Sequence, residues 1–181
     1  MKSKISIVFR SILAIFFVIS FVDLYSQTKT VTEGKYSYEI VENDPLNARI
    51  YTLDNGLKVV LSQDKTAPII AVGVYYNIGF RIEPKDRTGF AHLFEHMMFQ
   101  GSKNLGKMEF IKLVQQNGGV LNGSTRFDFT NYYEVMPSHK LETALWAEAD
   151  RMKGLAVTQD NLVNQQGVVK NEVKVNVLNQ P

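Results

Sequence analysis

One short apolar stretch, residues 90–99 (FAHLFEHMMF), constrains the fold of this chain more than any other feature. Its pattern predicts a helix that is apolar on every side apart from His92, Glu95 and His96, and we expect such a helix to be buried. Burying three ionisable side chains without partners costs several kcal/mol. The fold therefore has to supply partners for all three.

The spacing of these side chains indicates a shared cation. His92 and His96 are four residues apart, so both imidazoles lie on one face of the helix, one turn from each other. Two neutral imidazoles in this arrangement can bind one Zn²⁺ at about 2.0–2.1 Å each. Glu95 points toward the same side and can accept a proton from an attacking water. The alternative is a pair of core histidines bonded to backbone carbonyls, with Glu95 in a salt bridge.

A zinc site needs at least one more ligand. The chain has no cysteine, so that ligand has to be a nitrogen or oxygen donor. Glu172 falls on the expected apolar face of its helix, which is unusual for a solvated carboxylate, but Glu148 also borders an apolar stripe. The pattern alone therefore leaves the choice open among several downstream carboxylates: Glu109, Glu134, Glu142, Glu148, Asp150 and Glu172.

The remaining segments predict an α+β fold. The turn Asp54-Asn55-Gly56 lies between two strand-like segments and predicts a hairpin, and residues 69–78 are so continuously apolar that we expect a strand buried on both faces. Strands interleaved with helices through hairpin connections predict a mainly antiparallel sheet with helices packed on one face. The strands are expected at residues 49–53, 57–62, 69–78 and 120–136 (two strands or one bent strand), and the helices at 89–99, 107–117, 138–153 and 158–178.

The N-terminal residues read as a signal peptide covering residues 1–26. A positive start with Lys2, Lys4 and Arg10 precedes an uncharged run at residues 12–22. That run is shorter than the roughly 20 residues a membrane span needs, although an uncleaved anchor is the alternative. We therefore expect an exported protein, periplasmic or secreted, without a stable membrane span after cleavage. Residues 27–47 are polar and lack periodicity, which predicts a linker or an N-terminal arm.

Charge argues against nucleic acid as a partner. Removing the expected leader takes away three basic side chains and Asp23, so that 20 basic and 18 acidic side chains become 17 of each. A chain without net positive charge lacks the electrostatic attraction that nucleic-acid binding uses.

Residues 92–96 (HLFEH) form the reversed HExxH signature of the inverzincins. Here the chain resembles the N-terminal half of the pitrilysin, insulysin and mitochondrial processing peptidase family. Residues 79–83 (GFRIE) are similar to the family's Gly-Ser-Arg-x-Glu loop, with Phe80 in place of the usual small residue. The resemblance covers about residues 48–181 and extends to further positions: Gly118, Gly119, Asn122, Thr125, Asp128, Thr130, Tyr132, Pro137, residues 149–152 and residues 169–172.

The resemblance implies a complete site. It selects Glu172, which follows Asn171 and is separated from His96 by 75 residues, as the third Zn²⁺ ligand beside the two histidines. Glu95 is implied as the general base of a zinc metalloendopeptidase that cleaves peptides or small unfolded proteins. The family binds substrate as an added strand along an exposed strand edge, which residues 121–124 resemble, with Asn122 as the polar contact. An ordinary strand with an Asn-Gly kink is the alternative.

The resemblance also implies a partner. Family members close two homologous halves around the substrate, so we expect residues 48–181 to be an incomplete zinc-binding domain, inactive alone and completed by a second half downstream or on another subunit. Seven residues before Glu172, where the family often has a carboxylate, this chain has Gln165, which puts that position's auxiliary role in question. A non-catalytic scaffold or substrate-presenting subunit is the competing hypothesis. Such members usually lose motif residues, whereas this chain keeps all four.

Overall fold

The computed structural model describes residues 28–178 and divides the chain into two compact units, one ending at Thr66 and the other beginning at Ala67. The signal peptide expected at residues 1–26 lies outside the described residues. Across residues 28–178, no helix has both the length and the apolar character needed to cross a membrane.

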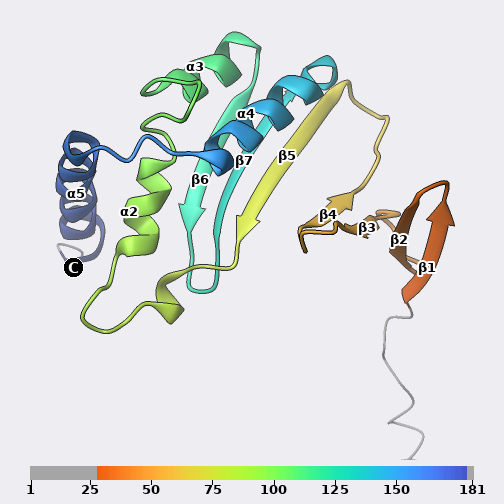
Figure 1. Cartoon of the computed structure of the whole chain (residues 1–181), viewed down its shortest axis with the longest axis horizontal. Coiled ribbons are helices and arrows are strands. Elements are labelled where there is room, and N and C mark those ends of the chain that lie inside the picture. Colours follow the sequence, from red (N-terminus) through yellow and green to blue (C-terminus); the bar gives the residue numbers. More distant parts are fainter. Residues whose placement is uncertain (1–27, 179–181) are drawn as a thin grey trace, which may run out of the picture. The chain divides into compact units, whose positions relative to one another are not determined.

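The first unit is a four-stranded antiparallel sheet with strand order β1-β2-β3-β4 (Figure 1). Strands β3 (Arg49–Thr52) and β4 (Lys58–Leu61) form the predicted hairpin, whose turn includes Gly56 at a φ of 83°. A positive φ of this kind is the reason for glycine in such a turn. The prediction of this hairpin is confirmed.

Strands β1 (Thr28–Glu33) and β2 (Tyr36–Val41) give regular structure to a segment whose sequence lacks periodicity. They pair along their whole length around a two-residue turn at Gly34-Lys35. Tyr38 is the buried side chain of this hairpin, and its ring lies 5.1 Å from that of Tyr51. Backbone pairing rather than burial of alternate side chains holds these strands, so their sequence carries little periodicity. The role of this segment as a linker or N-terminal arm stays a prediction.

The second unit contains a three-stranded antiparallel sheet with strand order β5-β7-β6. Strand β5 (Ile69–Tyr76) and the hairpin of β6 (Val120–Thr125) and β7 (Thr130–Pro137) make up this sheet, so the two-strand alternative for residues 120–136 is the correct one. The expected burial of β5 on both faces is wrong. Alternate residues are exposed, with Ile69 at 56% and Tyr75 at 65%, because the helices cover only one face.

Two helices cover that face of the sheet. Helix α3 (Glu109–Gln116) contributes Phe110 and Val114, and helix α4 (Leu141–Lys153) contributes small alanine side chains that let it lie close to β7 (Figure 1). The fully buried core consists of Phe110, Val114, Met136, Ala144 and Ala147. This arrangement confirms the predicted α+β fold with an antiparallel sheet and helices on one face.

Two further α-helices of the described residues lie beyond the edge of the sheet. Helix α2 (Phe90–Met97) packs beside the edge strand β6, and helix α5 (Gln159–Val173) packs against α2, so that β6, α2 and α5 stand in a row (Figure 1). A π-helical turn, Lys174–Leu178, follows α5. This row brings residues from three distant parts of the sequence together.

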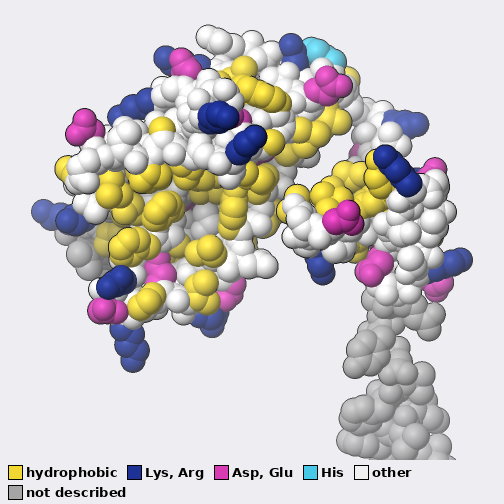
Figure 2. Space-filling model, viewed as in Figure 1, with side chains coloured by type: hydrophobic (Ala, Val, Ile, Leu, Met, Phe, Trp, Pro, Cys, Tyr) yellow, Lys and Arg dark blue, Asp and Glu magenta, His cyan; other side chains and the backbone are white. Residues whose placement is uncertain are grey.

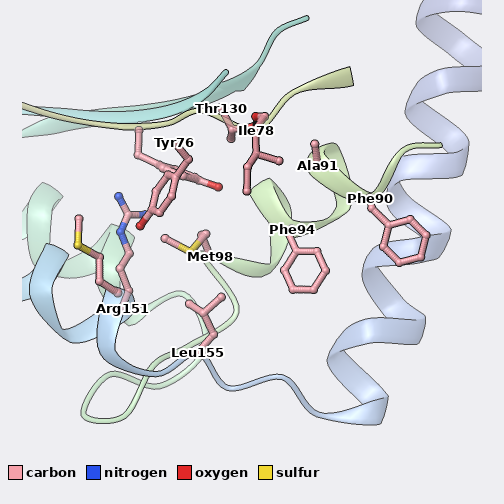
Figure 3. A pocket seen from close by; sticks show the side chains of 11 residues that line it. Tyr76, Ile78, Phe90, Ala91, Phe94, Met98, Thr130, Arg151 and Leu155 are labelled. Atoms are coloured by element: carbon pink, nitrogen blue, oxygen red, sulfur yellow. Dashed lines mark hydrogen bonds between the residues drawn. The ribbon is translucent and has the colours of Figure 1, made fainter. Parts of the chain in front are cut away.

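Helix α2 is less buried than its composition predicts. Ala91, Leu93 and Met97 are buried, whereas Phe90 and Phe94 are 49% and 44% exposed. Figure 2 shows apolar side chains gathered on the face of the second unit that is turned toward the viewer. The exposed side of α2 lines an apolar pocket of about 350 Å³ (Figure 3) together with side chains of β5, β7 and α4. The complete burial expected for this helix is therefore wrong for the part of the chain that the structure describes.

A buried charged cluster joins α4 to β7. The Arg151 guanidinium forms an ion pair with Glu148 and stacks over the rings of Phe110, at 4.1 Å, and Tyr132, at 4.5 Å. Glu134, only 1% exposed, lies beside them, and its carboxylate faces that of Glu148. Burial and the neighbouring Glu148 raise the pKa of Glu134 to about 8. This shift favours the protonated form of Glu134 in the folded protein at neutral pH.

Candidate metal centre

The histidine-bearing helix α2 begins at a carboxylate cap. Gly89 N and Ala91 N each donate a hydrogen bond of 2.7 Å to the two carboxylate oxygens of Glu83. This satisfies two of the donors that a helix start leaves unpaired and places a negative charge at the positive end of the helix dipole. Gly89 itself has a φ of 90°, which a side chain would disfavour. Glu83 of the 79–83 loop thus fixes where α2 starts, and with it the positions of His92 and His96.

The same loop is attached to the end of the β6–β7 hairpin. Arg81 Nε donates to Asp128 Oδ1 at 2.5 Å, and Phe80 N donates to the Arg126 carbonyl at 3.0 Å. Gly79 allows this close approach, because a Cβ at that position would lie 2.4 Å from the same carbonyl oxygen. The ring of Phe80 meets that of His92 edge-on, with centroids 6.3 Å apart. The loop therefore fixes the start of α2, the end of the β6–β7 hairpin and the ring of His92 relative to one another.

The three candidate ligands converge at one point. His92 Nε2 and His96 Nε2 are 3.2 Å apart, and each lies 3.4 Å from Glu172 Oε2. Ligands placed about 2.0–2.1 Å from a tetrahedral Zn²⁺ are separated by about 3.3–3.4 Å, the edge of that tetrahedron. The spacing and the nitrogen and oxygen chemistry of the donors therefore fit a zinc ion. Among residues 28–178, no other group of three such side chains comes this close together.

Helix α5 delivers Glu172 to the imidazoles. The helix starts at Thr158, whose Oγ1 accepts a hydrogen bond of 3.2 Å from Asn161 N. Gln165, Val169 and Glu172 follow at helical spacing, so they share the face turned toward α2. Gln165 and Val169 are buried, and Glu172 at the end of the row is half-buried. The three donors thus lie at the rim of the contact between α2 and α5, where solvent reaches them.

Glu95 of α2 lies against the edge strand β6. Thr125 Oγ1 donates a hydrogen bond of 2.5 Å to Glu95 Oε2. The other carboxylate oxygen lies above Gly123, where an added Cβ would approach it to 3.3 Å. Glu95 is therefore held against β6 and is not one of the three converging donors.

Asn122 lies exposed on the same strand. Its Oδ1 accepts a hydrogen bond of 2.9 Å from Gly123 N, so the side chain folds back on its own strand. Asn122 directly precedes Gly123, the residue against which Glu95 lies. It is not one of the three converging donors.

The other carboxylates that chemistry allowed have different partners. Glu134 and Glu148 belong to the buried cluster with Arg151, and Asp150 accepts hydrogen bonds from Ser102 Oγ at 2.6 Å and Asn104 N at 3.1 Å. These bonds lower the pKa of Asp150, with the Ser102 hydroxyl as the largest cause. Glu109 Oε2 accepts from Gly106 N at 2.6 Å. None of them reaches the histidines.

Two contacts at the centre were not predicted. In the sequence, Thr125 stood out only as one of the positions at which the chain resembles the family. Gln165 stood out only as the position where this chain lacks the carboxylate that the family often has. In the structure, Gln165 Oε1 lies 3.2 Å from His96 Nδ1. Its place one turn before Val169 and two turns before Glu172 is the sequence signal that could have identified it, because all three fall on one helix face.

Comparison with known proteins gives a consistent result. The family model described as "Insulinase (Peptidase family M16)" matches residues 58–180. The chain is 37% identical over 131 residues to "Zinc protease PqqE" of Helicobacter pylori, covering 72% of this chain and 30% of that protein. It is 38% identical over 104 residues to "Insulin-degrading enzyme homolog" of Dictyostelium discoideum, covering 57% of this chain and 11% of that protein.

A solved structure agrees with the sequence matches. The crystal structure of a protease from Helicobacter pylori superimposes with a TM-score of 0.71 at 37% identity, covering 74% of this chain and 32% of that one. The chain thus spans less than a third of the length of each of these proteins.

Proposed function

This chain belongs to the insulinase family of peptidases, family M16, whose members include zinc proteases, and from that membership we propose that it forms the zinc-binding part of a metalloendopeptidase. The observation that carries the proposal is the convergence of His92 Nε2, His96 Nε2 and Glu172 Oε2 at distances of 3.2 and 3.4 Å. Three protein ligands with one position left for water or substrate are typical of a catalytic zinc site, whereas structural sites are closed by four.

Different residues of the chain bind the metal, transfer the proton and orient the general base. His92, His96 and Glu172 hold the ion, which when bound lowers the pKa of water to about 7 and polarises a carbonyl. Glu95 accepts the proton of the attacking water at its carboxylate and returns it to the leaving amine. The Thr125 hydroxyl, 2.5 Å from Glu95 Oε2, keeps that carboxylate in one orientation.

An extended peptide is the substrate class that suits this site. In the described part of the chain β6 pairs only with β7, so its outer edge offers backbone donors and acceptors. A peptide that adds as a further strand uses those groups and passes Glu95, which is held against Gly123 and Thr125. We include Asn122, exposed on that strand, as a polar contact to the substrate.

The proposal extends to the rest of the protein. We propose a second homologous half, in the same chain or in a partner subunit, because the proteins with which this chain matches are more than three times as long as the matched part. Export through the N-terminal segment, to the periplasm or beyond, is part of the same proposal and rests on the pattern of residues 1–26 alone.

Zinc content and cleavage of a quenched fluorescent peptide test the proposal in the whole protein. We expect Glu95→Gln to keep the zinc and to lose about 10²- to 10⁴-fold in kcat, the usual contribution of a general base. Glu172→Ala should lose the metal. A wild-type protein that binds zinc but cleaves no peptide would favour the non-catalytic scaffold, and one that binds no zinc would contradict the site itself.

A further inference from the structure

Gln165 is a buried polar residue to which the proposed chemistry gives no role. It is 6% exposed, at the contact between α5 and α2, and its Oε1 lies 3.2 Å from His96 Nδ1. A buried amide needs hydrogen-bond partners, and here its partner is a side chain that we propose as a zinc ligand. The contact therefore bears on the state of that imidazole.

The contact favours one tautomer of His96. An amide oxygen has lone pairs and no proton, so the contact is a hydrogen bond when the facing Nδ1 carries the hydrogen. A neutral imidazole with its proton on Nδ1 presents a lone pair on Nε2. That Nε2 is the atom that lies 3.2 Å from His92 Nε2 and 3.4 Å from Glu172 Oε2. Gln165 thus turns the free lone pair of His96 toward the other two donors.

One helix provides both the contact and a ligand. Gln165 and Glu172 are two turns apart on α5, on the face that packs against α2. The docking of α5 that brings Glu172 to the histidines also brings Gln165 to the far nitrogen of His96. The amide adds no charge, so Glu172 stays the one negative side chain among the three proposed ligands and Gln165.

We propose that Gln165 is the positioning residue of the metal centre: it holds the Nδ1–H tautomer of His96 through its amide oxygen and so prepares Nε2 for the ion. The inference rests on the proposed zinc site. It differs from a packing role, because it depends on a hydrogen-bond acceptor at this position and not on the volume of the side chain.

Zinc affinity in three variants tests the inference. The association constant is measured on the whole protein by competition with a chromophoric chelator. Gln165→Leu keeps the approximate volume and removes the acceptor, and we expect the association constant to fall about 10- to 100-fold, as for other partners of metal-bound histidines. Gln165→Glu keeps an acceptor and should bind zinc at least as tightly as the wild type. Gln166→Leu, at the exposed neighbouring glutamine, is the matched control and should leave the affinity unchanged.

A measurement on the unmutated protein keeps the inference testable if a variant fails to fold. Long-range ¹⁵N–¹H spectra of the metal-free protein, at a pH where histidine is neutral, report the tautomer of His96. We expect Nδ1–H before any metal is added, and an Nε2–H tautomer would overturn the inference. Equal affinity in Gln165→Leu and the wild type, or a loss in Gln165→Glu as large as in Gln165→Leu, would do the same. A wild-type protein that binds no zinc would instead overturn the proposed function.

Discussion

The hydroxyl of Thr125 donates a hydrogen bond of 2.5 Å to the carboxylate of Glu95. This bond joins the edge strand β6 to helix α2, and so joins the strand proposed to bind the substrate to the residue proposed to move the proton. A peptide bound along β6 would therefore meet a carboxylate whose orientation that strand already fixes.

Replacing Thr125 by valine removes the hydroxyl and keeps the shape of the side chain. A hydrogen bond to a charged group contributes about 1.5–3 kcal/mol, so we expect kcat for peptide cleavage to fall about 10- to 100-fold while zinc content stays the same. Steady-state kinetics and metal analysis of the whole protein check this. Thr125→Ser keeps the donor and should stay near the wild-type rate. An unchanged kcat in the valine variant would show that the bond does not orient Glu95.

Removing zinc should lower the thermal stability. The ion would connect α2 to α5, and a ligand at about 100 times its Kd stabilises the folded state by about 2.7 kcal/mol. For a domain of this size, that corresponds to a Tm lowered by roughly 5–11 °C in the presence of a chelator. Calorimetry with and without the chelator measures it. The Tm of Glu172→Gln should respond little to the chelator, and an equal response in both proteins would argue against the site.

Substituting alanine for Gly79 should destabilise the protein. The new Cβ would lie 2.4 Å from the carbonyl oxygen of Arg126 and 2.6 Å from that of Phe127, both backbone atoms that cannot swing away. Overpacking of this kind costs about 1–3 kcal/mol, measurable by urea denaturation. Gly167→Ala is the control. No other atom lies within 4 Å of its Cβ position in α5, so we expect a stabilisation of about 0.5–1 kcal/mol there.

The free energy of unfolding should decrease as the pH rises toward 8. Burial raises the pKa of Glu134 from an ordinary 4.5 to about 8, so the folded protein binds a proton that the unfolded chain releases. The stabilisation from this proton is fully present below about pH 4.5 and is lost as the pH passes 8. Urea denaturation at a series of pH values should show this slope in the wild type.

Variants at two glutamates identify the source of that slope. Glu134→Gln stays neutral at every pH and should largely remove it, whereas Glu142→Gln, on the exposed side of α4, should leave it intact. A slope that persists in Glu134→Gln would place the responsible proton elsewhere.

Much of the second unit could be predicted from the sequence because its signals are local. Helix α2, the hairpin of β6 and β7 and the helices α3, α4 and α5 all follow from periodicity and turn residues. The proximity of His92 and His96 follows from helix geometry alone. The choice of Glu172 among six carboxylates did not follow from geometry, because it depends on how α5 docks against α2.

The features that the sequence did not predict also have physical causes. A continuous apolar strand such as β5 does not reveal how many layers cover it, and one of its faces carries exposed Ile69 and Tyr75. The strands β1 and β2 bury little besides Tyr38, so they leave almost no alternating pattern. The contacts of Thr125 and Gln165 join elements that are 30 and 69 residues apart, and no local pattern encodes them.

The distance along the chain between the two helices of the metal centre bears on how the protein is made. At a synthesis rate of about 5–20 residues per second, roughly 4–15 s pass between the appearance of His96 and that of Glu172 on the ribosome. During that interval the nascent polypeptide offers an imidazole pair without its carboxylate. We therefore expect metal loading to come late in biogenesis, after α5 has been synthesised and has docked.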